Sequence, residues 1–276
     1  MFRNIKMDKL PFVSIIMPCK NEVDFLEGCI DSILASDYPE ERMEILVVDG
    51  MSTDGSRPLV NKYANKSTKV YLLDNPRSVT PVALNIGLKN AKGEILIRMD
   101  AHAMYPHDYI SECVKAISKY DMASVGGSWN IKPRTNNFIA RLIIAAFSHK
   151  FGVGNNAYRL SRNADAQIVD TVPYFCCTRN TLETFAALDK KQADLALFNE
   201  DLVRGQDMDF NNRLRKVGGK VVLVPSISSF YFARTELFGM IRHYFVNGIW
   251  AILPILYSKE LAISKRHLVP LVFNIT

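Results

Sequence analysis

Two residues near the middle of the chain have the types and spacing of a metal site. Asp100 and His102 follow an apolar run in the stretch RMDAHAMYP (98–106). In an extended chain, side chains two residues apart point to the same side, so both could reach one divalent cation. Such a cation would stabilise a diphosphate leaving group, and a carboxylate with an imidazole suits Mn²⁺ somewhat better than Mg²⁺. The alternative interpretation is a hydrogen-bonded polar turn.

A second group of acids lies in NEDLVRGQDMDFNNRLRKVGG (199–219). Asp207 falls where a helix should begin, at an exposed edge, and a carboxylate placed there can take the proton of an attacking hydroxyl. Glu200 and Asp201 are rivals for this role of base. The segment could equally be the acidic start of a capped helix.

Polar residues after the first two apolar runs could bind a nucleotide. Asp49 ends the run in VVDGMSTDGS (47–56), where a buried carboxylate needs a hydrogen-bond donor such as the N–H of a pyrimidine ring. Lys20 lies in PCKNE (18–22), at the start of a helix whose free N–H groups favour phosphate. Each stretch taken alone is also explained as a turn and a helix cap.

These candidate residues follow apolar strands that alternate with helices. Strands are expected at 12–18, 44–49, 69–73 and 94–100, and the helix after the third strand should have Thr80 as its N-cap. The alternation predicts an α/β fold with a mostly parallel sheet and helices on both faces. Ligands of such sheets bind at the carboxyl ends of the strands, so the candidate residues should gather along one edge.

The second half of the chain is less regular. Its expected elements are strands at 122–131, 168–178, 220–225 and 226–233, helices at 136–149 and 206–219, and a polar, mobile loop over the site at 150–168.

Composition narrows the classes of function. Apolar residues make up 48% of the 276 residues, enough for a sizeable core, and the net charge of +6 is too diffuse to indicate a nucleic-acid partner. That charge suits a nucleotide phosphate or an anionic membrane face. Five cysteines without metal-ligand spacing predict core thiols in a reducing compartment, and the N-terminus lacks the apolar run of a signal peptide. The expected location is the cytoplasm.

Residues 235–276 differ in character from the rest. The run YFVNGIWAILPILY (244–257) is apolar, is flanked by Arg242 and Lys259, and is shorter than the roughly 20 residues that span a bilayer. It suits a helix at the membrane interface with aromatic side chains at headgroup level, and a core helix is the alternative. The apolar residues that follow could begin a spanning helix.

Taken in order, four stretches resemble the family 2 glycosyltransferases, which have the GT-A fold. They are VSIIMPCKNE, ILVVDGMSTDGS, NPRSVTPVALNIGLKNAKGEILIRMDAH and GQDMDFNNRLRKVGGKV, and the likeness covers about residues 12–250. The stretch RMDAHAMYPHDYI resembles the succinoglycan-type exopolysaccharide branch. The resemblance implies a Rossmann-like GT-A domain at 1–233, with a nucleotide-binding half at about 11–125 and an acceptor half at about 126–233. A helical, membrane-associated tail would follow at 234–276.

The resemblance also implies roles for single residues. Asp100 matches the metal-binding aspartate, and Asp207 matches the catalytic base. His102 replaces the last acid of the usual Asp-x-Asp, and Gln206 replaces the glutamate that usually precedes the base. The Gln-x-x-Arg-Trp motif of processive synthases is absent, which favours the addition of one sugar at a time. The residues that fall where the family lines its nucleotide pocket are Pro18, Lys20, Asn21, Glu22, Asp49, Ser52, Arg77, Asn85 and Asp100, and the candidates for diphosphate contact are Arg242 and His243.

The implied activity is metal-dependent, inverting transfer from a nucleotide-diphosphate sugar, expected to be a UDP-sugar, with Mn²⁺ or Mg²⁺ as cofactor. The acceptor would be a hydroxyl of a lipid-linked or polysaccharide molecule at the inner face of the cell membrane. A sugar nucleotidyltransferase is a weaker alternative, because PCKNEVD lacks the glycine-rich phosphate loop expected after the first strand of such an enzyme. The other alternative is a non-catalytic subunit that binds nucleotide sugars, and the presence of Asp100 and Asp207 argues against it.

Overall fold

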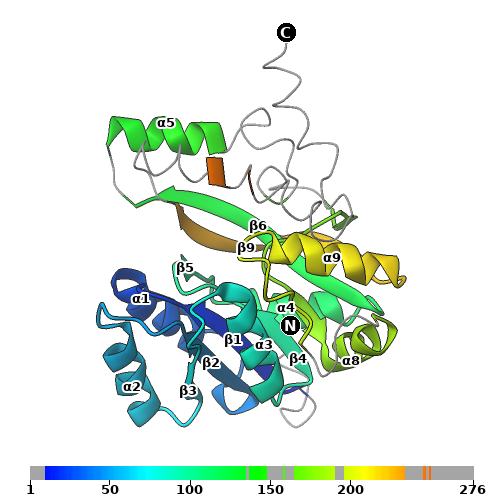
Figure 1. The fold of residues 1–276 in the computed structure, drawn as a ribbon, viewed down its shortest axis with the longest axis horizontal. Helices are drawn as coiled ribbons and strands as arrows, with labels where there is room; N and C mark the ends of the chain where they lie inside the picture. The colour runs from blue at the N-terminus through cyan, green and yellow to red at the C-terminus, as the bar shows by residue number, and fades with distance from the viewer. Residues whose placement is uncertain are drawn as a thin grey trace.

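The computed structural model describes residues 10–134, 137–147, 158, 165–189, 196–233, 245–246 and 249. Its described strands form one nine-stranded sheet (Figure 1). The strands are β1 (Val13–Cys19), β2 (Met43–Asp49), β3 (Val70–Asp74), β4 (Ile95–Arg98), β5 (Ala103–Met104), β6 (Ala123–Pro133), β7 (Gln167–Ile168), β8 (Cys176–Thr178) and β9 (Lys220–Ala233). The helices are α1 (Val23–Leu34), η3 (Glu40–Arg42, a 3₁₀ turn), α2 (Ser56–Lys66), α3 (Thr80–Asn90), α4 (Tyr109–Ile117), α5 (Phe138–Phe147), α8 (Arg179–Leu188) and α9 (Gln206–Lys216).

The sheet is mixed, so the prediction of a mostly parallel sheet is confirmed only in part: six of the nine described strands run in one direction, and β5, β7 and β8 run against them. The strand order is β3-β2-β1-β4-β8-β6-β9-β5, with β7 also paired to β9. β3, β2, β1 and β4 run parallel, as predicted. β8 is antiparallel to both of its neighbours, and β9 is parallel to β6 but antiparallel to β5 and β7. Apolar patterning reveals that a strand is buried, whereas its direction depends on where the chain re-enters the sheet.

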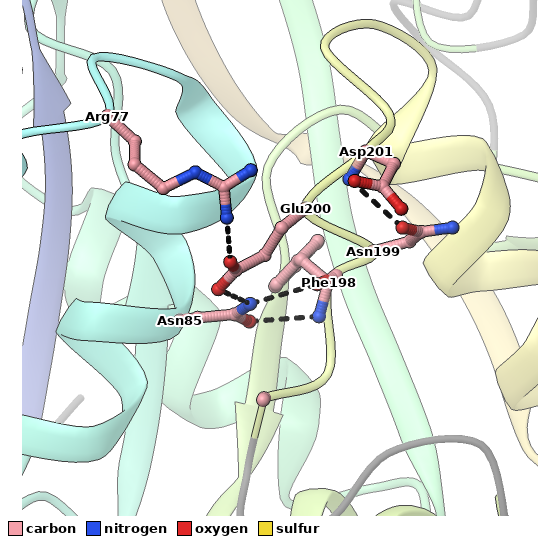
Figure 2. A pocket seen from close by; sticks show the side chains of 7 residues that line it. Arg77, Asn85, Phe198, Asn199, Glu200 and Asp201 are labelled. Carbon is pink, nitrogen blue, oxygen red and sulfur yellow. Dashed lines mark hydrogen bonds and ion pairs between the residues drawn. The ribbon is translucent and has the colours of Figure 1, made fainter.

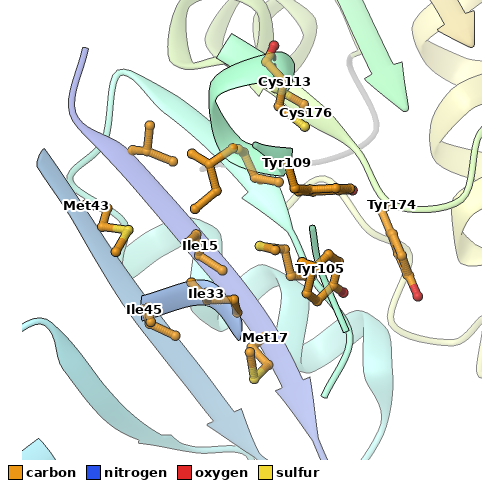
Figure 3. Packing of buried hydrophobic residues seen from close by; sticks show 14 of the residues in the cluster. Ile15, Met17, Ile33, Met43, Ile45, Tyr105, Tyr109, Cys113, Tyr174 and Cys176 are labelled. Atoms are coloured by element: carbon orange, nitrogen blue, oxygen red, sulfur yellow. Dashed lines mark hydrogen bonds between the residues drawn. The ribbon is translucent and has the colours of Figure 1, made fainter. Parts of the chain in front are cut away.

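Helices cover both faces of the first four strands, as predicted. Ile15 and Met17 face a cluster that includes side chains of α1 and α4 (Figure 3). Ile16, Leu46 and Leu96 face the opposite cluster, which includes side chains of α3, α8 and α9. Side chains alternate between the faces of a strand, so a strand buried on both faces is apolar along most of its length. This explains the continuous apolar runs.

Several element boundaries differ from the prediction. α3 begins at Thr80 itself and Val79 occupies the N-cap position, so Thr80 is not the cap. The strand expected at 168–178 is instead β7 and β8, and the segment between them includes Tyr174, whose φ of 31° is not that of extended backbone. The two strands expected at 220–233 form the single strand β9. Pro225 is accommodated where the pairing of β6 with β9 shifts register, because a strand irregularity needs no ladder hydrogen bond from proline.

The remaining sequence predictions concern cysteines and membrane segments. All five cysteines are buried and free, which confirms the prediction of core thiols. Most of the expected loop at 150–168 and of the tail at 234–276 lies outside the described residues. In the part of the chain that the structure describes, no helix combines the length and hydropathy that a transmembrane span requires.

Candidate active site

The first parallel strands end at one edge of the sheet, and the loops that follow them meet there. The N–H of Gly50 donates to the carbonyl of Cys19 (2.8 Å), and the N–H of Asn75 donates to the carbonyl of Asp49 (2.8 Å). A cavity of about 140 Å³ lies at this edge. Among its lining residues are five of the predicted site residues and one additional arginine, namely Pro18, Lys20, Glu22, Asp100, His102 and Arg98.

The predicted metal pair lies at this cavity, but in a different backbone conformation from the one expected. β4 ends at Arg98, and Asp100 begins a turn in which its carbonyl accepts from the N–H of Ala103 (3.3 Å). The extended geometry predicted for Asp100 and His102 is therefore wrong. The turn still leaves both residues lining one cavity, with Nδ1 of His102 3.3 Å from Oε1 of Glu22.

Arg98 joins the two aspartates of greatest interest. It is only 6% exposed, and its Nε and Nη2 donate to the two carboxylate oxygens of Asp100 at 2.9 and 3.3 Å. Its Nη1 donates to Asp207. Burial alone would lower the pKa of Arg98, but the charges of Asp100 and Asp207 outweigh burial and raise it. The two carboxylates thus meet through one guanidinium.

Asp207 is the second residue of α9, and this placement matches the prediction. α9 follows Gly205, whose φ of 78° is favourable for glycine, and the Asp207 side chain remains 32% exposed. Burial raises the pKa of Asp207; the nearby positive charge of Arg98 opposes that change and the negative charge of Asp100 adds to it. A carboxylate with a raised pKa is the better proton acceptor.

Asn21 and Ser52 connect the loops that follow β1 and β2. The N–H of Asn21 donates to Oγ of Ser52 (2.8 Å), and the N–H of Thr53 donates to Oδ1 of Asn21 (2.9 Å). Oγ of Ser52 in turn donates to Asp49. These two predicted nucleotide residues therefore fix the shape of the loops beside the cavity.

Asp49 has the donors that its burial requires, and they come from the chain itself. The residue is 1% exposed and accepts hydrogen bonds from Ser52 and from Nη1 of Arg57 (2.8 Å). Nη2 of Arg57 also donates to Asp74 at the end of β3 (2.8 Å). The requirement for a donor was deduced correctly from the sequence, and the structure shows which side chains satisfy it.

Arg77 and Asn85 lie at a second cavity of about 350 Å³, together with Glu200 (Figure 2). Arg77 forms an ion pair with Glu200. Nδ2 of Asn85 donates to Glu200 (3.0 Å) and to the carbonyl of Phe198 (2.9 Å), whose N–H donates back to Oδ1 of Asn85 (2.9 Å). Glu200, a rival for the role of base, therefore pairs with Arg77 and Asn85 at this second cavity. Arg242 and His243, the other predicted contacts, lie outside the described residues.

A model of the family described as Glycosyl transferase family 2 matches residues 14–189, which span β1 to α8 and include the cavity of Lys20 and Asp100. The chain belongs to this family. It is therefore a glycosyltransferase, as the sequence resemblance implied. The match ends before α9, so it does not include Asp207.

Two of the curated relatives of this glycosyltransferase match most of the chain. It is 30% identical to a dolichyl N-acetyl-alpha-D-glucosaminyl phosphate 3-beta-D-2,3-diacetamido-2,3-dideoxy-beta-D-glucuronosyltransferase of Methanococcus voltae, over 82% of this chain and 68% of that protein. It is 26% identical to the succinoglycan biosynthesis protein ExoA of Rhizobium meliloti, over 85% of this chain and 67% of that protein. The chain thus spans about two thirds of the length of each relative, and the resemblance to the succinoglycan branch is confirmed.

Solved structures show that the glycosyltransferase has a GT-A-like fold. The mannosyltransferase PcManGT from Pyrobaculum calidifontis, in complex with GDP-Man and Mn²⁺, aligns with a TM-score of 0.59 and 21% identity over 95% of this chain and 72% of that one. Residues 1–349 of S. aureus TarS, in complex with UDP-GlcNAc, align with a TM-score of 0.60 and 16% identity over 88% of this chain and 66% of that one. At these identities the likeness establishes the fold.

Sequence reasoning missed three residues of the glycosyltransferase site. Arg98 had a signal, because a charged residue inside the buried strand EILIRMD requires an opposite charge nearby. Arg57 had a matching signal, because the buried Asp49 needs a donor, for which the sequence analysis suggested a pyrimidine ring and not an arginine. Asn75 had none: it is 2% exposed, lines the cavity, and its Oδ1 has no hydrogen-bond partner.

The side chains at the cavity fit a divalent cation that is shared with phosphate. Asp100 offers carboxylate oxygens and His102 offers a ring nitrogen. Within the described ranges, no cluster of three or more His, Cys, Asp or Glu side chains could hold a cation by itself. Mg²⁺ in enzymes is commonly held by one or two carboxylates, and substrate phosphates and water complete its coordination. Two protein ligands are enough for a site of that kind.

Proposed function

We propose that this chain is a metal-dependent, inverting glycosyltransferase that moves a sugar from a nucleotide-diphosphate sugar, with UDP-sugars as the first candidates, to an acceptor hydroxyl. The observation that carries the proposal is that Asp100 and Asp207 share the guanidinium of Arg98, which lines the cavity together with Asp100. One carboxylate lies at the ends of the parallel strands, where donors bind in α/β sheets, and the other begins a helix of the second half. We assign about residues 11–125 to donor binding and 126–233 to acceptor binding.

The chemistry requires one proton acceptor and a place for the diphosphate. The acceptor oxygen attacks the anomeric carbon on the face opposite the diphosphate, and the bond from that carbon to the phosphate oxygen breaks. The configuration inverts, the hydroxyl proton passes to Asp207, and the nucleoside diphosphate leaves with the bonding electrons. Lys20 would bind the phosphates. The N–H groups of Glu22 and Val23 at the start of α1, which the sequence suggested for this role, already donate to Ser56 and Asp54. A cation on Asp100 and His102 would neutralise the negative charge that grows on the leaving group.

Asn75 supports donor binding at this cavity. Its backbone N–H and its Nδ2 are both bonded within the protein, to Asp49 and to Val79, whereas its buried Oδ1 has no partner. A buried acceptor without a donor costs free energy, and an N–H or O–H of the nucleotide sugar would remove that cost.

We also propose that the acceptor, a lipid-linked sugar or a growing polysaccharide, is reached at the inner face of the cell membrane. α5 packs Ala140 and Ile143 against the body, yet Phe138, Ile139 and Leu142 are 74%, 47% and 55% exposed. Figure 1 shows α5 at the far end of β6, away from the first four strands. The surrounding residues 122–164 contain no Asp or Glu and six Lys or Arg (Lys132, Arg134, Arg141, Lys150, Arg159 and Arg162).

This combination suits an anionic membrane. An apolar helix face within a basic, acid-free segment gains free energy both from burial in the lipid interface and from attraction to anionic headgroups. The tail gave the first indication of membrane contact in the sequence, and α5 is a second and independent one. The names of the relatives are consistent with such acceptors, since one is named for a dolichyl phosphate sugar and the other for succinoglycan.

A donor panel tests the transferase proposal. Purified protein is incubated with Mn²⁺, membrane lipid extract and single UDP- or GDP-sugars, and released nucleoside diphosphate is measured. We expect release with at least one donor and stimulation by the extract. A nucleoside triphosphate with sugar 1-phosphate serves as the control, and product in that control alone would favour a nucleotidyltransferase. Donor binding without release from any donor would favour the non-catalytic subunit.

Flotation with vesicles tests the membrane proposal. The wild type should float with phosphatidylglycerol vesicles, less so at high salt, and little with phosphatidylcholine vesicles. The triple variant Phe138→Ser, Ile139→Ser, Leu142→Ser should stay at the bottom. The matched control is Ile168→Ser with Leu188→Ser, which removes apolar side chains of similar exposure (69% and 52%) from other elements. Wild-type protein that fails to float with anionic vesicles would contradict the proposal.

A further inference from the structure

Three arginines of the described chain each lie between two aspartates, and one of them is at the candidate active site. Arg57 bridges Asp49 and Asp74. Arg213 bridges Asp189 and Asp209, and Arg98 bridges Asp100 and Asp207. Of the three, Arg98 lines the cavity of Lys20 and His102.

We propose that Arg98 is a positioning residue, which holds the carboxylate of Asp207 beside the donor cavity before the acceptor arrives. This inference rests on the proposed function of Asp207 as the base. Arg98 belongs to β4 and Asp207 to α9, so this contact crosses from the first half of the chain to the second. The guanidinium has one edge on Asp100 and its remaining terminal nitrogen on Asp207.

The geometry explains why an arginine is needed at this position. A guanidinium is planar and offers donors in fixed directions, so it can hold two carboxylates at a defined angle. A lysine ammonium is a single point charge on a flexible stem, and it would compensate charge without fixing that angle. The two like charges of Asp100 and Asp207 would also repel each other if the cation between them were removed. A misplaced base lowers the rate of the chemical step even if donor binding is intact.

Arg213 provides a matched comparison within the same molecule. It is 8% exposed, close to the 6% of Arg98, and it contacts Asp189, Asp209 and the carbonyl of Leu197. It sits on α9, the helix of Asp207, and does not line the cavity of Arg98. A purely structural role predicts the same behaviour for both arginines, whereas a positioning role predicts that they differ.

The test compares Arg98→Lys, Arg98→Ala and Arg213→Lys by melting temperature, donor KM and kcat. We expect Arg98→Lys to remain folded with donor KM within about threefold of wild type and kcat reduced by at least about tenfold. Because Arg98 lines a cavity, guanidinium ion at millimolar, non-denaturing concentration should restore part of the kcat of Arg98→Ala. Sodium chloride or urea at the same concentration should not. Arg213→Lys should melt earlier but keep its kcat at a temperature at which it is folded.

The outcomes that overturn the inference are distinct from those that overturn the proposed function. A kcat of Arg98→Lys close to that of wild type would show that the planar guanidinium, with its donors in fixed directions, is not needed. Equal losses of kcat in folded Arg98→Lys and Arg213→Lys would show that the role is structural. If Arg98→Ala does not fold, the lysine variants decide alone. Absence of transfer by the wild-type protein would instead reject the proposed function itself.

Discussion

Two clusters of the protein use the same ion-pair chemistry over very different distances along the chain. Arg57 on α2 joins Asp49 and Asp74, which end the neighbouring strands β2 and β3. Arg98 joins Asp100, two residues away, to Asp207 on a helix of the second half. The Arg57 cluster joins the ends of two neighbouring strands, whereas the Arg98 cluster joins a distant carboxylate to an arginine that lines the donor cavity. An arginine between two aspartates can therefore either stabilise the fold or assemble a site, and its place in the fold determines its role.

The two clusters also differ in exposure. The side chain of Arg57 is 28% exposed and that of its partner Asp74 is 59% exposed, while the side chain of Arg98 is 7% exposed. Water screens exposed charges and leaves buried ones strongly coupled. Changes in the Arg98 cluster should therefore alter the chemistry strongly, and changes in the Arg57 cluster should alter stability and donor binding more moderately.

The largest expected effect comes from removing the base of the Arg98 cluster. Asp207→Asn keeps the shape of the side chain but cannot take a proton, so kcat should fall by about 10²- to 10⁴-fold while donor binding persists. Because burial raises the pKa of Asp207, the acid limb of the wild-type rate profile should lie above pH ~4, where an ordinary aspartate ionises. Activity is lost as the pH falls through the pKa, since only the ionised carboxylate accepts the proton.

The control for this variant is Asp209→Asn on the same helix, where the carboxylate pairs with Arg213 (2.8 Å). It should leave kcat nearly unchanged. Near-normal turnover by Asp207→Asn, measured as nucleoside diphosphate release, would show that Asp207 is not the base. The Arg98 and Arg57 clusters would then not differ in function.

A smaller effect is expected from breaking the Arg57 cluster. Arg57→Met leaves the buried carboxylate of Asp49 with Ser52 as its donor, so the free energy of unfolding should fall by about 1–2 kcal/mol. The loops beside the cavity should loosen, and donor KM should rise by a larger factor than kcat falls. Urea unfolding and donor titration measure the two quantities. The control is Lys62→Met, which breaks an ion pair with Glu27 between half-exposed side chains and should change neither the free energy of unfolding nor donor KM. If Lys62→Met lowered the free energy of unfolding as much as Arg57→Met does, the Arg57 cluster would have no special role.

The smallest expected effect concerns metal binding beside the Arg98 cluster. His102→Ala removes one of two proposed ligands beside Asp100, so the Mn²⁺ concentration for half-maximal rate should rise severalfold with little change in the saturated rate. A manganese titration measures this, with His107→Ala at an exposed position as the control. An unchanged titration would make His102 a turn residue that contacts Glu22 and nothing more.

The sequence by itself determined the first half of the fold and which residues lie at its edge. Apolar runs separated by helices can form only a sheet covered on both faces, and parallel strands must end on the same side. For this reason Lys20, Asp100 and His102 could be placed together without coordinates. The same reasoning showed that Asp49 needed a donor, because a buried carboxylate without one is unstable.

Tertiary structure alone decided the pairings between the halves. The direction of β8, the passage of β9 through Pro225, and the contact of Arg77 with Glu200 all depend on where distant segments meet. So does the choice of Asp207 as a partner of Arg98, since the sequence offers 28 acids and no local pattern selects among them. Periodicity is a local property of the chain, whereas an ion pair depends only on distance in space.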